Sequence, residues 1–313
     1  MRSLVTGGAG FLGSHVVEVL VARGDSVRVL DNLSSGRLEN LSSVARGIEF
    51  IEGDVRDSDA CRSACRGIHR VWHLAASVSV PQSLEDPLTT HEVNSTGTLR
   101  LLLAARDSGA ERFVVASSCA VYGDNPQLPC TENDPTAPMS PYAVSKLDCE
   151  HFARVFWQLY RMETVALRYF NIYGPRQDAD SHYAAVVPKF LSALTSGRAP
   201  TVFGNGEQSR EFTFVRDCAE AALLAGNVGG QDMAGETFNI AVGRATTVNE
   251  LLAAMQRELG VSLPAVYAPE RPGEIRFSQA NIQKAADLLG FTPRWSLEEG
   301  IHETAEWFLS RRP

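Results

Sequence analysis

The sequence predicts an α/β protein in which a parallel sheet carries helices on both faces and a smaller, loop-rich unit follows. Two observations predict the sheet. Short runs rich in Val, Ile and Phe alternate with helical patterns through the first half of the 313-residue chain. Parallel strands need crossover connections, and strands buried on both faces are nearly continuous apolar runs. A third observation predicts the second unit: after Gly174, glycine and proline break the chain into short pieces.

The elements of the first half can be assigned in chain order. We expect buried strands at 3–6, 26–31, 48–51, 70–74, 112–117 and 164–170. Residues 11–23 form the first helix, because Leu12, Val16 and Leu20 share one face at helical spacing and Gly24 ends it.

The two units are expected to be interleaved. A helix at 217–225 and a strand at 236–241 look like elements that return to the sheet. The sheet unit would then take 1–174 and about 214–242. The smaller unit would take 175–213 and 243–313 and lie over the carboxyl edge of the sheet.

Composition excludes several classes of function. A net charge of −8 and a pI near 5.4 oppose binding to nucleic acid or to an anionic membrane. The chain contains no run of 18 apolar residues, so we expect no membrane-spanning helix. The six cysteines form no CxxC pair, and no histidine completes a zinc site beside Cys61 and Cys65. We therefore expect reduced thiols, no metal and a cytoplasmic location.

A glycine-rich loop, TGGAGFLG at 6–13, lies between the first strand and the first helix. Gly7, Gly10 and Gly13 permit a tight turn, close approach to a diphosphate and close helix packing, and the helix N-terminus offers free N–H groups to the anion. Asp31, at the end of the second strand, has the spacing of the acid that binds adenosine ribose and repels a 2′-phosphate. These features predict a Rossmann-type doubly wound sheet that binds NAD rather than NADP.

A second pattern, Tyr142 and Lys146, places two side chains on one helix face. An ammonium beside a phenol lowers the pKa of the phenol, which would make Tyr142 a general base. A hydroxyl from Ser117 or Ser118, at the end of the preceding strand, could orient a substrate oxygen whose proton Tyr142 removes.

Seven segments together resemble the extended short-chain dehydrogenases/reductases, in that order and over nearly the full length: GGAGFLG, DNLSSG, GDV, HLAA, SSCAVYG, SPYAVSK and RYFNIYGPRQ. The resemblance implies that Ser118, Tyr142 and Lys146 are the catalytic triad. It implies a tightly bound NAD, held with the glycine loop by Gly7, Gly10, Phe11, Leu12, Gly13, Asp31, Asn32, Ser35, Gly36, Asp54, Val55, Leu74, Ala75, Ala76, Asn94, Ser117, Tyr142, Lys146 and Tyr169.

The resemblance also indicates the reaction. Relatives that eliminate water resemble one another in an Asp-Glu pair after the active-site Thr, where this chain has Cys119-Ala120. A 4-epimerase needs no further acid or base: Tyr142 takes the proton of the sugar 4-hydroxyl, C4 gives hydride to NAD, and the 4-keto sugar turns over before hydride returns. Alternatives are a UDP-glucuronate 4-epimerase or decarboxylase, with Arg176 as a carboxylate ligand, a TDP-hexose 4-epimerase, or a non-catalytic NAD- or sugar-nucleotide-binding protein.

The second unit resembles a sugar-nucleotide domain. Two arginines suit a diphosphate because their forked donors match phosphate oxygens. The implied substrate residues are Ser79, Ser118, Tyr142, Asn171, Ala185, Val186, Thr201, Phe203, Arg210, Phe212, Arg271, Glu274 and Ser278.

Two finer expectations concern substrate size and assembly. Ser278 stands where related 4-epimerases restricted to UDP-glucose and UDP-galactose carry a tyrosine, so UDP-GlcNAc and UDP-GalNAc should also fit, with Ser79 offering the acetamido group a hydrogen bond. Relatives pair two helices per subunit, and two apolar stripes predict a homodimer: Phe152, Val155, Phe156 and Leu159, and Leu99, Leu102 and Leu103.

Overall fold

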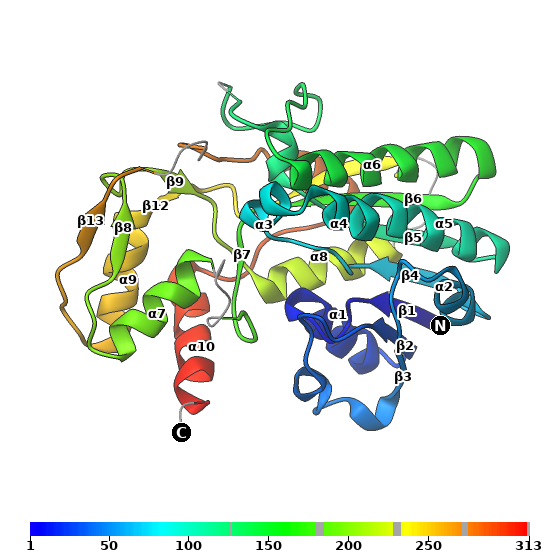
Figure 1. Ribbon diagram of the computed structural model, residues 1–313, viewed down its shortest axis with the longest axis horizontal. Coiled ribbons are helices and arrows are strands. Elements are labelled where there is room, and N and C mark those ends of the chain that lie inside the picture. The colour runs from blue at the N-terminus through cyan, green and yellow to red at the C-terminus, as the bar shows by residue number, and fades with distance from the viewer. Residues whose placement is uncertain (126, 179–184, 228–232, 271–274, 312–313) are drawn as a thin grey trace.

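A computed structural model describes residues 1–125, 127–178, 185–227, 233–270 and 275–311 (Figure 1). Its centre is a seven-stranded parallel sheet in the order β11-β6-β5-β4-β1-β2-β3. The strands are β1 (Arg2–Thr6), β2 (Ser26–Asp31), β3 (Ile48–Glu52), β4 (Arg70–His73), β5 (Arg112–Ser118), β6 (Glu163–Tyr169) and β11 (Glu236–Ile240). The predicted α/β class with a doubly wound parallel sheet is confirmed.

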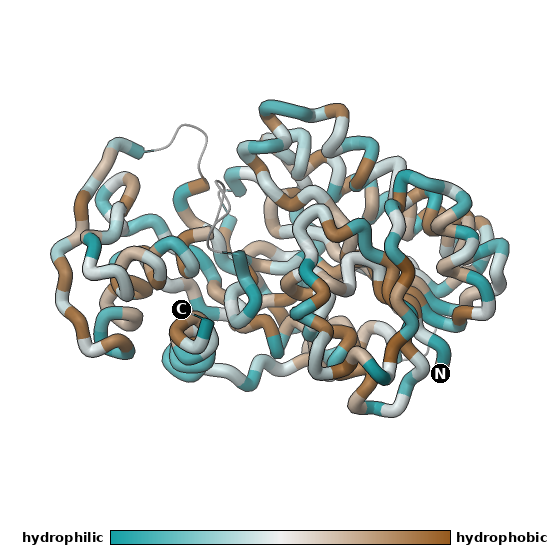
Figure 2. The backbone as a smooth tube through the Cα atoms, turned by 60° about the horizontal axis from the view of Figure 1, so that its bottom comes forward, coloured by the Kyte–Doolittle hydropathy of each residue, from teal (hydrophilic) through white to brown (hydrophobic). Residues whose placement is uncertain are grey.

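Helices cover both faces of the sheet, as the burial of apolar side chains on both faces requires. One face carries α1 (Phe11–Ala22) and α8 (Val215–Asn227), and the other carries α2 (Ser58–Cys65), α5 (Gly97–Asp107) and α6 (Pro141–Tyr160). The connections between them hold η1 (Leu38–Leu41), η2 (Ala45–Gly47), α3 (Val80–Glu85), α4 (Pro87–His91), the π-helical turn η3 (Glu92–Thr96) and η4 (Cys119–Tyr122). Hydrophobic residues gather along the strands between these layers (Figure 2).

The predicted elements agree with the observed ones to within two residues at each end. The helix expected at 217–225 is α8, and the strand expected at 236–241 is β11, which pairs with β6 at the edge of the sheet. One difference bears on the site: β5 extends to Ser118, because its pairing with β6 continues to the Ser118–Tyr169 register position. The candidate catalytic serine is therefore the last residue of a strand.

A second apolar core lies beside the sheet unit. It is built by α7, α9 and α10 with Tyr173, Phe212 and Phe214. Its elements are β7 (Ile172–Tyr173), α7 (Val186–Thr195), β8 (Thr201–Phe203), β9 (Ser209–Arg210), β10 (Thr213–Phe214), β12 (Thr246–Thr247), α9 (Val248–Leu259), β13 (Val266–Ala268) and α10 (Leu297–Ser310). The π-helical turn η5 (Ala285–Leu289) instead packs into the core of the sheet unit. The division into two domains at the expected boundaries stays a prediction.

His73 is buried at the end of β4. Its ring Nδ1 is 2.7 Å from Thr6 Oγ1, and its Nε2 is 2.9 Å from Thr98 Oγ1. Burial, assisted by the charge of Lys146, lowers the pKa of His73 to about 3. The folded protein therefore keeps this ring neutral at pH values where the unfolded chain would protonate it.

This difference predicts a pH-dependent contribution to stability. Between about pH 6.5 and 3 the unfolded chain binds a proton at His73 that the folded chain does not, so stability falls as pH falls. From pH 7 to 5, His73 should cost about 2 kcal/mol of unfolding free energy. His73→Asn should lose about 2 kcal/mol less than wild type over that interval in urea unfolding. The exposed His151→Asn is the control, and equal losses in wild type and His73→Asn would contradict the assignment.

Candidate active site

The turn between β1 and α1 is closed around its glycines. Gly7 has φ +69° and its amide donates to Leu30 O at 2.9 Å, which ties the turn to β2. A Cβ on Gly13 would lie 2.0 Å from Gly7 O, and a Cβ on Gly7 would lie 2.7 Å from Ala75 N. Gly10 begins α1 without a side-chain cap, so the first-turn amides, including those of Phe11 and Leu12, are suited to an anion. The turn fits the diphosphate of a dinucleotide.

Asp31 organises the loop that follows β2. Its carboxylate accepts from Ala9 N and Leu33 N, each at 2.9 Å, and a Cβ on Gly36 would lie 2.9 Å from its Oδ1. Burial raises the pKa of Asp31, and the two backbone donors oppose that rise. Each carboxylate oxygen retains a lone pair beyond these bonds, so ribose hydroxyls can still donate to it. Its ribose-binding role stays a prediction.

The segment after β3 brings together three of the expected cofactor-binding residues, Asn32, Asp54 and Val55. Asn32 Nδ2 donates to Asp54 Oδ2 at 2.8 Å, and Arg56 donates to the same carboxylate through its backbone and guanidinium. The hydrogen bonds from Arg56 and Asn32 lower the pKa of Asp54 to about 2. Val55 is buried beside this charged pair.

The segment after β4, Leu74 to Ser77, lies between the glycine turn and the π-helical turn η3. Asn94 lies within η3, where its Oδ1 accepts from Ser77 N at 2.8 Å and its Nδ2 donates to Ser77 O at 2.9 Å. Single π-turns of this kind frequently mark functional sites. Asn94 thus fixes the backbone at Ser77, directly after Ala75 and Ala76.

The catalytic candidates meet where α6 crosses β5. Ser140 caps α6 and Pro141 is its first residue, so Tyr142 and Lys146 lie in its first two turns. The Ser118 hydroxyl, at the end of β5, hydrogen-bonds the Tyr142 phenol. Lys146 Nζ donates to Ala116 O at 2.9 Å and lies 6.0 Å from the centre of the Tyr142 ring. The structure therefore brings all three predicted residues together.

The prediction that Lys146 lowers the pKa of Tyr142 is wrong when only the protein's own groups act on the phenol. Burial raises the pKa of Tyr142 to about 12, although the hydrogen bond from Ser118 pulls it down. Burial also lowers the pKa of Lys146. The reason is desolvation: both side chains are buried, and a low-dielectric surrounding disfavours whichever form is charged.

Ser117 and Tyr169, both expected near the cofactor, are engaged elsewhere through their hydroxyls. The Ser117 hydroxyl donates to Glu150, and Tyr169 OH donates to Cys218 O at 3.5 Å. Their main chains and the Tyr169 ring remain for contact with a ligand. Ser35 lies in the loop between Asp31 and Gly36.

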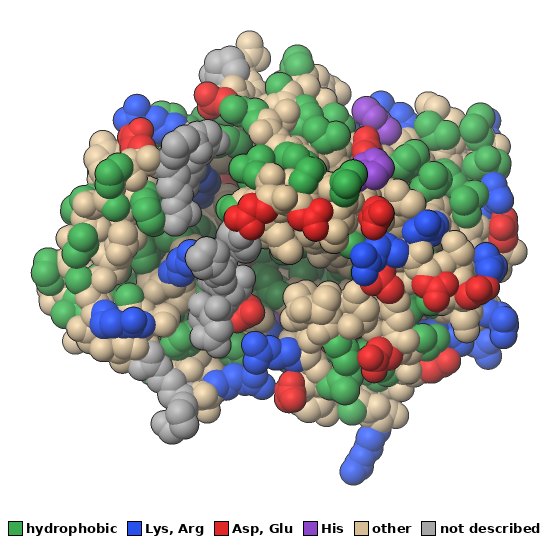
Figure 3. All heavy atoms as spheres, viewed as in Figure 1, with side chains coloured by type: hydrophobic (Ala, Val, Ile, Leu, Met, Phe, Trp, Pro, Cys, Tyr) green, Lys and Arg blue, Asp and Glu red, His purple; other side chains and the backbone are tan. Residues whose placement is uncertain are grey.

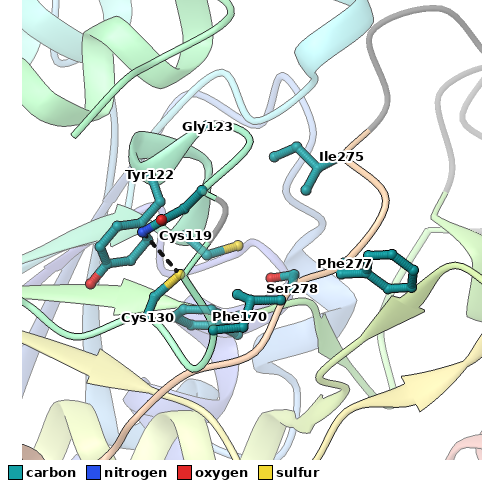
Figure 4. A pocket seen from close by; sticks show the side chains of 10 residues that line it. Cys119, Tyr122, Gly123, Cys130, Phe170, Ile275, Phe277 and Ser278 are labelled. Carbon is teal, nitrogen blue, oxygen red and sulfur yellow. Dashed lines mark hydrogen bonds between the residues drawn. The ribbon is translucent and has the colours of Figure 1, made fainter. Parts of the chain in front are cut away.

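A small pocket is lined by Cys119, which directly follows Ser118 in the chain, and by Ser278 (Figure 4). The Cys119 thiol lies near Ser118, Ser278 and the Asn171 backbone, and these groups act to lower its pKa. Burial nevertheless raises the pKa of the Cys119 thiol. The lining residues are Cys119, Tyr122, Gly123, Asn125, Leu128, Cys130, Phe170, Ile275, Phe277 and Ser278.

Other expected substrate residues hold the second unit together. Arg210 donates to Ser209 O at 2.8 Å, to Arg276 O at 3.0 Å and to Ile275 O, so its guanidinium braces the segment that leads to Ser278. Asn171 Nδ2 donates to Glu211 O at 3.2 Å. The apolar candidates surround the second core: Ala185 and Val186 begin α7, Thr201 and Phe203 lie on β8, and Phe212 packs edge-on to Tyr173.

Arg176 and Ser79 have structural partners. Arg176 pairs with Glu18 at 2.6 Å across the start of the second unit, so the carboxylate that it binds is the protein's own. Ser79 accepts from Gln82 N at 3.1 Å as the N-cap of α3. Arg271 and Glu274 lie outside the described residues. No helix of the described residues is long and apolar enough to cross a membrane, and no group of three metal-ligating side chains occurs among them.

The comparisons with known proteins agree with this geometry. The model of the GDP-mannose 4,6 dehydratase family matches residues 4–304. The chain belongs to the extended short-chain dehydrogenase/reductase family. The UDP-glucose 4-epimerase of Mycolicibacterium smegmatis is 39% identical over 315 residues, which span 99% of each chain. Within the family, this chain belongs with the UDP-sugar 4-epimerases.

Two solved structures of this family match the fold closely. The UDP-N-acetylglucosamine 4-epimerase from Methanobrevibacter ruminantium M1, in complex with UDP-N-acetylmuramic acid, superposes with a TM-score of 0.95 at 39% identity and 99% coverage of both chains. The UDP-glucose 4-epimerase from Thermus thermophilus, in complex with NAD, has a TM-score of 0.91 at 39% identity and full coverage of both chains.

Three features of this family member were missed by sequence reasoning. The sequence showed only that Cys119 replaces an acidic residue, whereas in the structure its thiol lies near two candidate site residues, Ser118 and Ser278. Glu150 lies on the same face of α6 as Tyr142 and Lys146 at the same four-residue spacing, which is a signal that could have been read. Glu211 directly follows Arg210 and is fully buried, but nothing in the local sequence predicts that burial.

Proposed function

We propose that this protein interconverts the C4 epimers of a UDP-hexose through a 4-keto intermediate. The observation that carries the proposal is that Ser118, Tyr142 and Lys146 come together where α6 packs on the end of β5. A non-catalytic binding protein on the same fold would not need Ser118, Tyr142 and Lys146 at one place. Their convergence therefore supports an enzyme.

The cofactor is NAD. The glycine turn, the uncapped start of α1 and the acid at Asp31 suit a dinucleotide without a 2′-phosphate. Bound NAD⁺ supplies a hydride acceptor at the site, and the positive charge of its ring favours the phenolate form of Tyr142.

The chain's own residues perform the proton chemistry. Tyr142 Oη accepts the proton of the sugar 4-hydroxyl, and Ser118 Oγ holds that oxygen against the phenol. Lys146, fixed by Ala116 O, stabilises the phenolate that forms. The same phenol returns the proton when the keto group is reduced on its other face, so the cycle consumes no external acid or base.

Elimination of water is disfavoured by the neighbouring residues. The positions after Ser118 hold a half-buried thiol and a methyl group, Cys119 and Ala120. Neither can act as an acid or a carboxylate base at neutral pH, because burial raises the pKa of the thiol further. This supports epimerisation over 4,6-dehydration.

We propose that the substrates include N-acetylated hexoses. Ser278 leaves open the space that a tyrosine ring would fill, and the pocket lining is uncharged throughout its described residues. An uncharged lining suits an acetamido group better than the carboxylate of a uronate, which would need a cation to offset its desolvation. The M. ruminantium structure holds an N-acetylated UDP-sugar, which supports this choice.

One experiment tests the proposed function directly. The purified protein is offered UDP-glucose, UDP-GlcNAc, UDP-glucuronate and TDP-glucose, and products are identified by NMR. We expect C4 epimers of the first two. Formation of a 4-keto-6-deoxy sugar or a pentose would replace the proposal with a dehydratase or decarboxylase.

We also propose that the protein is a homodimer. The structure divides both apolar stripes: Phe156 and Leu102 are buried within the chain's own core, whereas Val155, Leu159 and Leu103 are 41%, 68% and 36% exposed. Apolar side chains also gather over α3, α4 and α6 on the face seen in Figure 3. The exposed half of each stripe would pack against a second copy.

Tyr142→Phe should fold normally, retain its cofactor and lose turnover by about 10²–10⁴-fold, because the phenyl ring keeps the packing but removes the general base. Turnover is measured with UDP-glucose, and the cofactor is released by denaturation and identified. Tyr267→Phe, on the exposed strand β13, is the matched control. Near-native turnover in Tyr142→Phe would remove this residue from the mechanism, and recovery of NADP(H) would overturn the cofactor assignment.

Ser278→Tyr should suppress the acetylated pair selectively. A phenol ring fills the space of the acetamido group, and overpacking a fitted pocket costs about 1–3 kcal/mol. We expect kcat/KM for UDP-GlcNAc to fall by about tenfold or more, with UDP-glucose as the internal control. The gatekeeper role is wrong if the variant treats both pairs alike or if wild type ignores UDP-GlcNAc.

Light scattering at micromolar concentration should give twice the 34.0 kDa mass of the chain. Leu159→Glu should shift the protein toward the monomer mass, because a charge in an apolar interface loses its water without gaining a partner. Leu309→Glu, an equally accessible change on α10, should leave the mass unaltered. A wild-type mass of one chain would contradict the dimer.

A further inference from the structure

Glu211 is a buried carboxylate that the mechanism does not use. It lies between Arg210 and Phe212, at the junction of β9 and β10, and is 0% exposed. No ion pair to it is found among the described lysines and arginines. Burial raises the pKa of Glu211, and its backbone donors act against that rise. A buried charge without a cation is costly, so its bonds to backbone N–H groups must offset the loss of water.

Those bonds join two segments that are distant in the chain. Glu211 Oε2 accepts from Val242 N at 2.9 Å and Gly243 N at 2.7 Å, just beyond β11 of the main sheet. Its Oε1 accepts from Ala280 N at 2.6 Å. One carboxylate therefore ties the edge of the sheet unit to the segment that ends at Ala280.

That segment is the outer wall of the pocket. Ser278 N donates to Ser209 O at 3.2 Å, and Ser209 N donates to Arg276 O at 3.1 Å, so residues 276–278 run along β9. On the other side, Cys130 N donates to Gln279 O at 2.8 Å. The two oxygens of Glu211 thus hold the wall and the sheet edge at the same time.

We propose that Glu211 is a positioning residue that sets the distance of the Ser278 wall from Cys119, and thereby the tolerance of the pocket for an acylamino substituent on the sugar. The inference rests on the proposed epimerase function and adds to it. Ser278 determines how much space is left, whereas Glu211 determines where that space lies. The positioning requires two acceptor oxygens at the end of this side chain, which only a carboxylate provides.

Glu211→Gln tests this geometry with almost no change of volume. A glutamine amide accepts through one oxygen and presents an NH₂ group on the other side, so one of the two segments faces a donor instead of an acceptor. The wall should then shift, and the larger substrate should be affected more. We expect KM for UDP-GlcNAc to rise and the ratio of kcat/KM for UDP-GlcNAc over UDP-glucose to fall by about tenfold. The kcat for UDP-glucose should stay within about twofold, because Ser118 and Tyr142 are untouched.

The matched control is Glu207→Gln, since Glu207 accepts from Asn249 in the same unit but does not contact the wall. It should leave the selectivity ratio unchanged. Thermal unfolding and the NAD content of each variant separate a local shift from a loss of structure. A ratio in Glu211→Gln equal to that of wild type, with both substrates slowed alike, would overturn the proposal.

Glu211→Asp provides a second variant, which keeps the charge but is too short to reach both segments. It should move the ratio in the same direction as Glu211→Gln. If neither variant accumulates as folded protein, Glu211 is a folding residue and the proposal is wrong. If wild type epimerises no UDP-hexose, the proposed function fails independently. In that case the role of Glu211 is tested by calorimetry, which measures the affinities for UDP-GlcNAc and UDP-glucose. A ratio of the two affinities that is the same in both variants as in wild type rejects the role.

Discussion

The site depends on the packing of α6 on β5 and β6, and the buried Glu150 of α6 bonds to both strands, to Ser117 on β5 and to Arg168 on β6. Glu150 accepts from Arg168 Nε at 2.9 Å and from its Nη2 at 2.7 Å, and it also accepts from Ser117. Because Glu150 lies two helical turns from Tyr142 on the same face, the pair sets the register of the helix against the strand. Ser117 precedes Ser118, so the same bond orients the end of β5. Removing either partner of this pair would be costly, because the other would remain as an uncompensated buried charge.

Burial gives the site its shape and also opposes its chemistry. The Tyr142 phenol and the Lys146 ammonium are both desolvated, so the pKa of the first rises to about 12 and the pKa of the second falls. A phenol in that state is a weak base at neutral pH. In the proposed mechanism the Lys146 ammonium and the positive charge of an oxidised cofactor ring would together favour the phenolate.

The second unit contributes a wall rather than a catalytic group. Arg210 and Glu211, adjacent in sequence, brace the segment that carries Ser278 through its carbonyls and its amide respectively. In the proposed function, catalysis and substrate size are therefore assigned to different structural elements, which approach each other near Cys119. A family with one reaction centre can vary its substrates through such a wall without disturbing the strand and helix that hold Ser118 and Tyr142.

The amino-acid sequence alone determined the sheet, the glycine turn and the Tyr142–Lys146 pair. Strand and helix periodicity are local, so elements were found to within two residues, and two side chains four residues apart must share a helix face. The tertiary structure decided the rest. Cys119 and Ser278 are far apart in the chain and come close together only because the two units pack against each other. The extent of burial depends on all neighbouring elements together and has no signature in a single segment. It sets the pKa of Tyr142, encloses Glu211 and decides which half of each apolar stripe stays exposed.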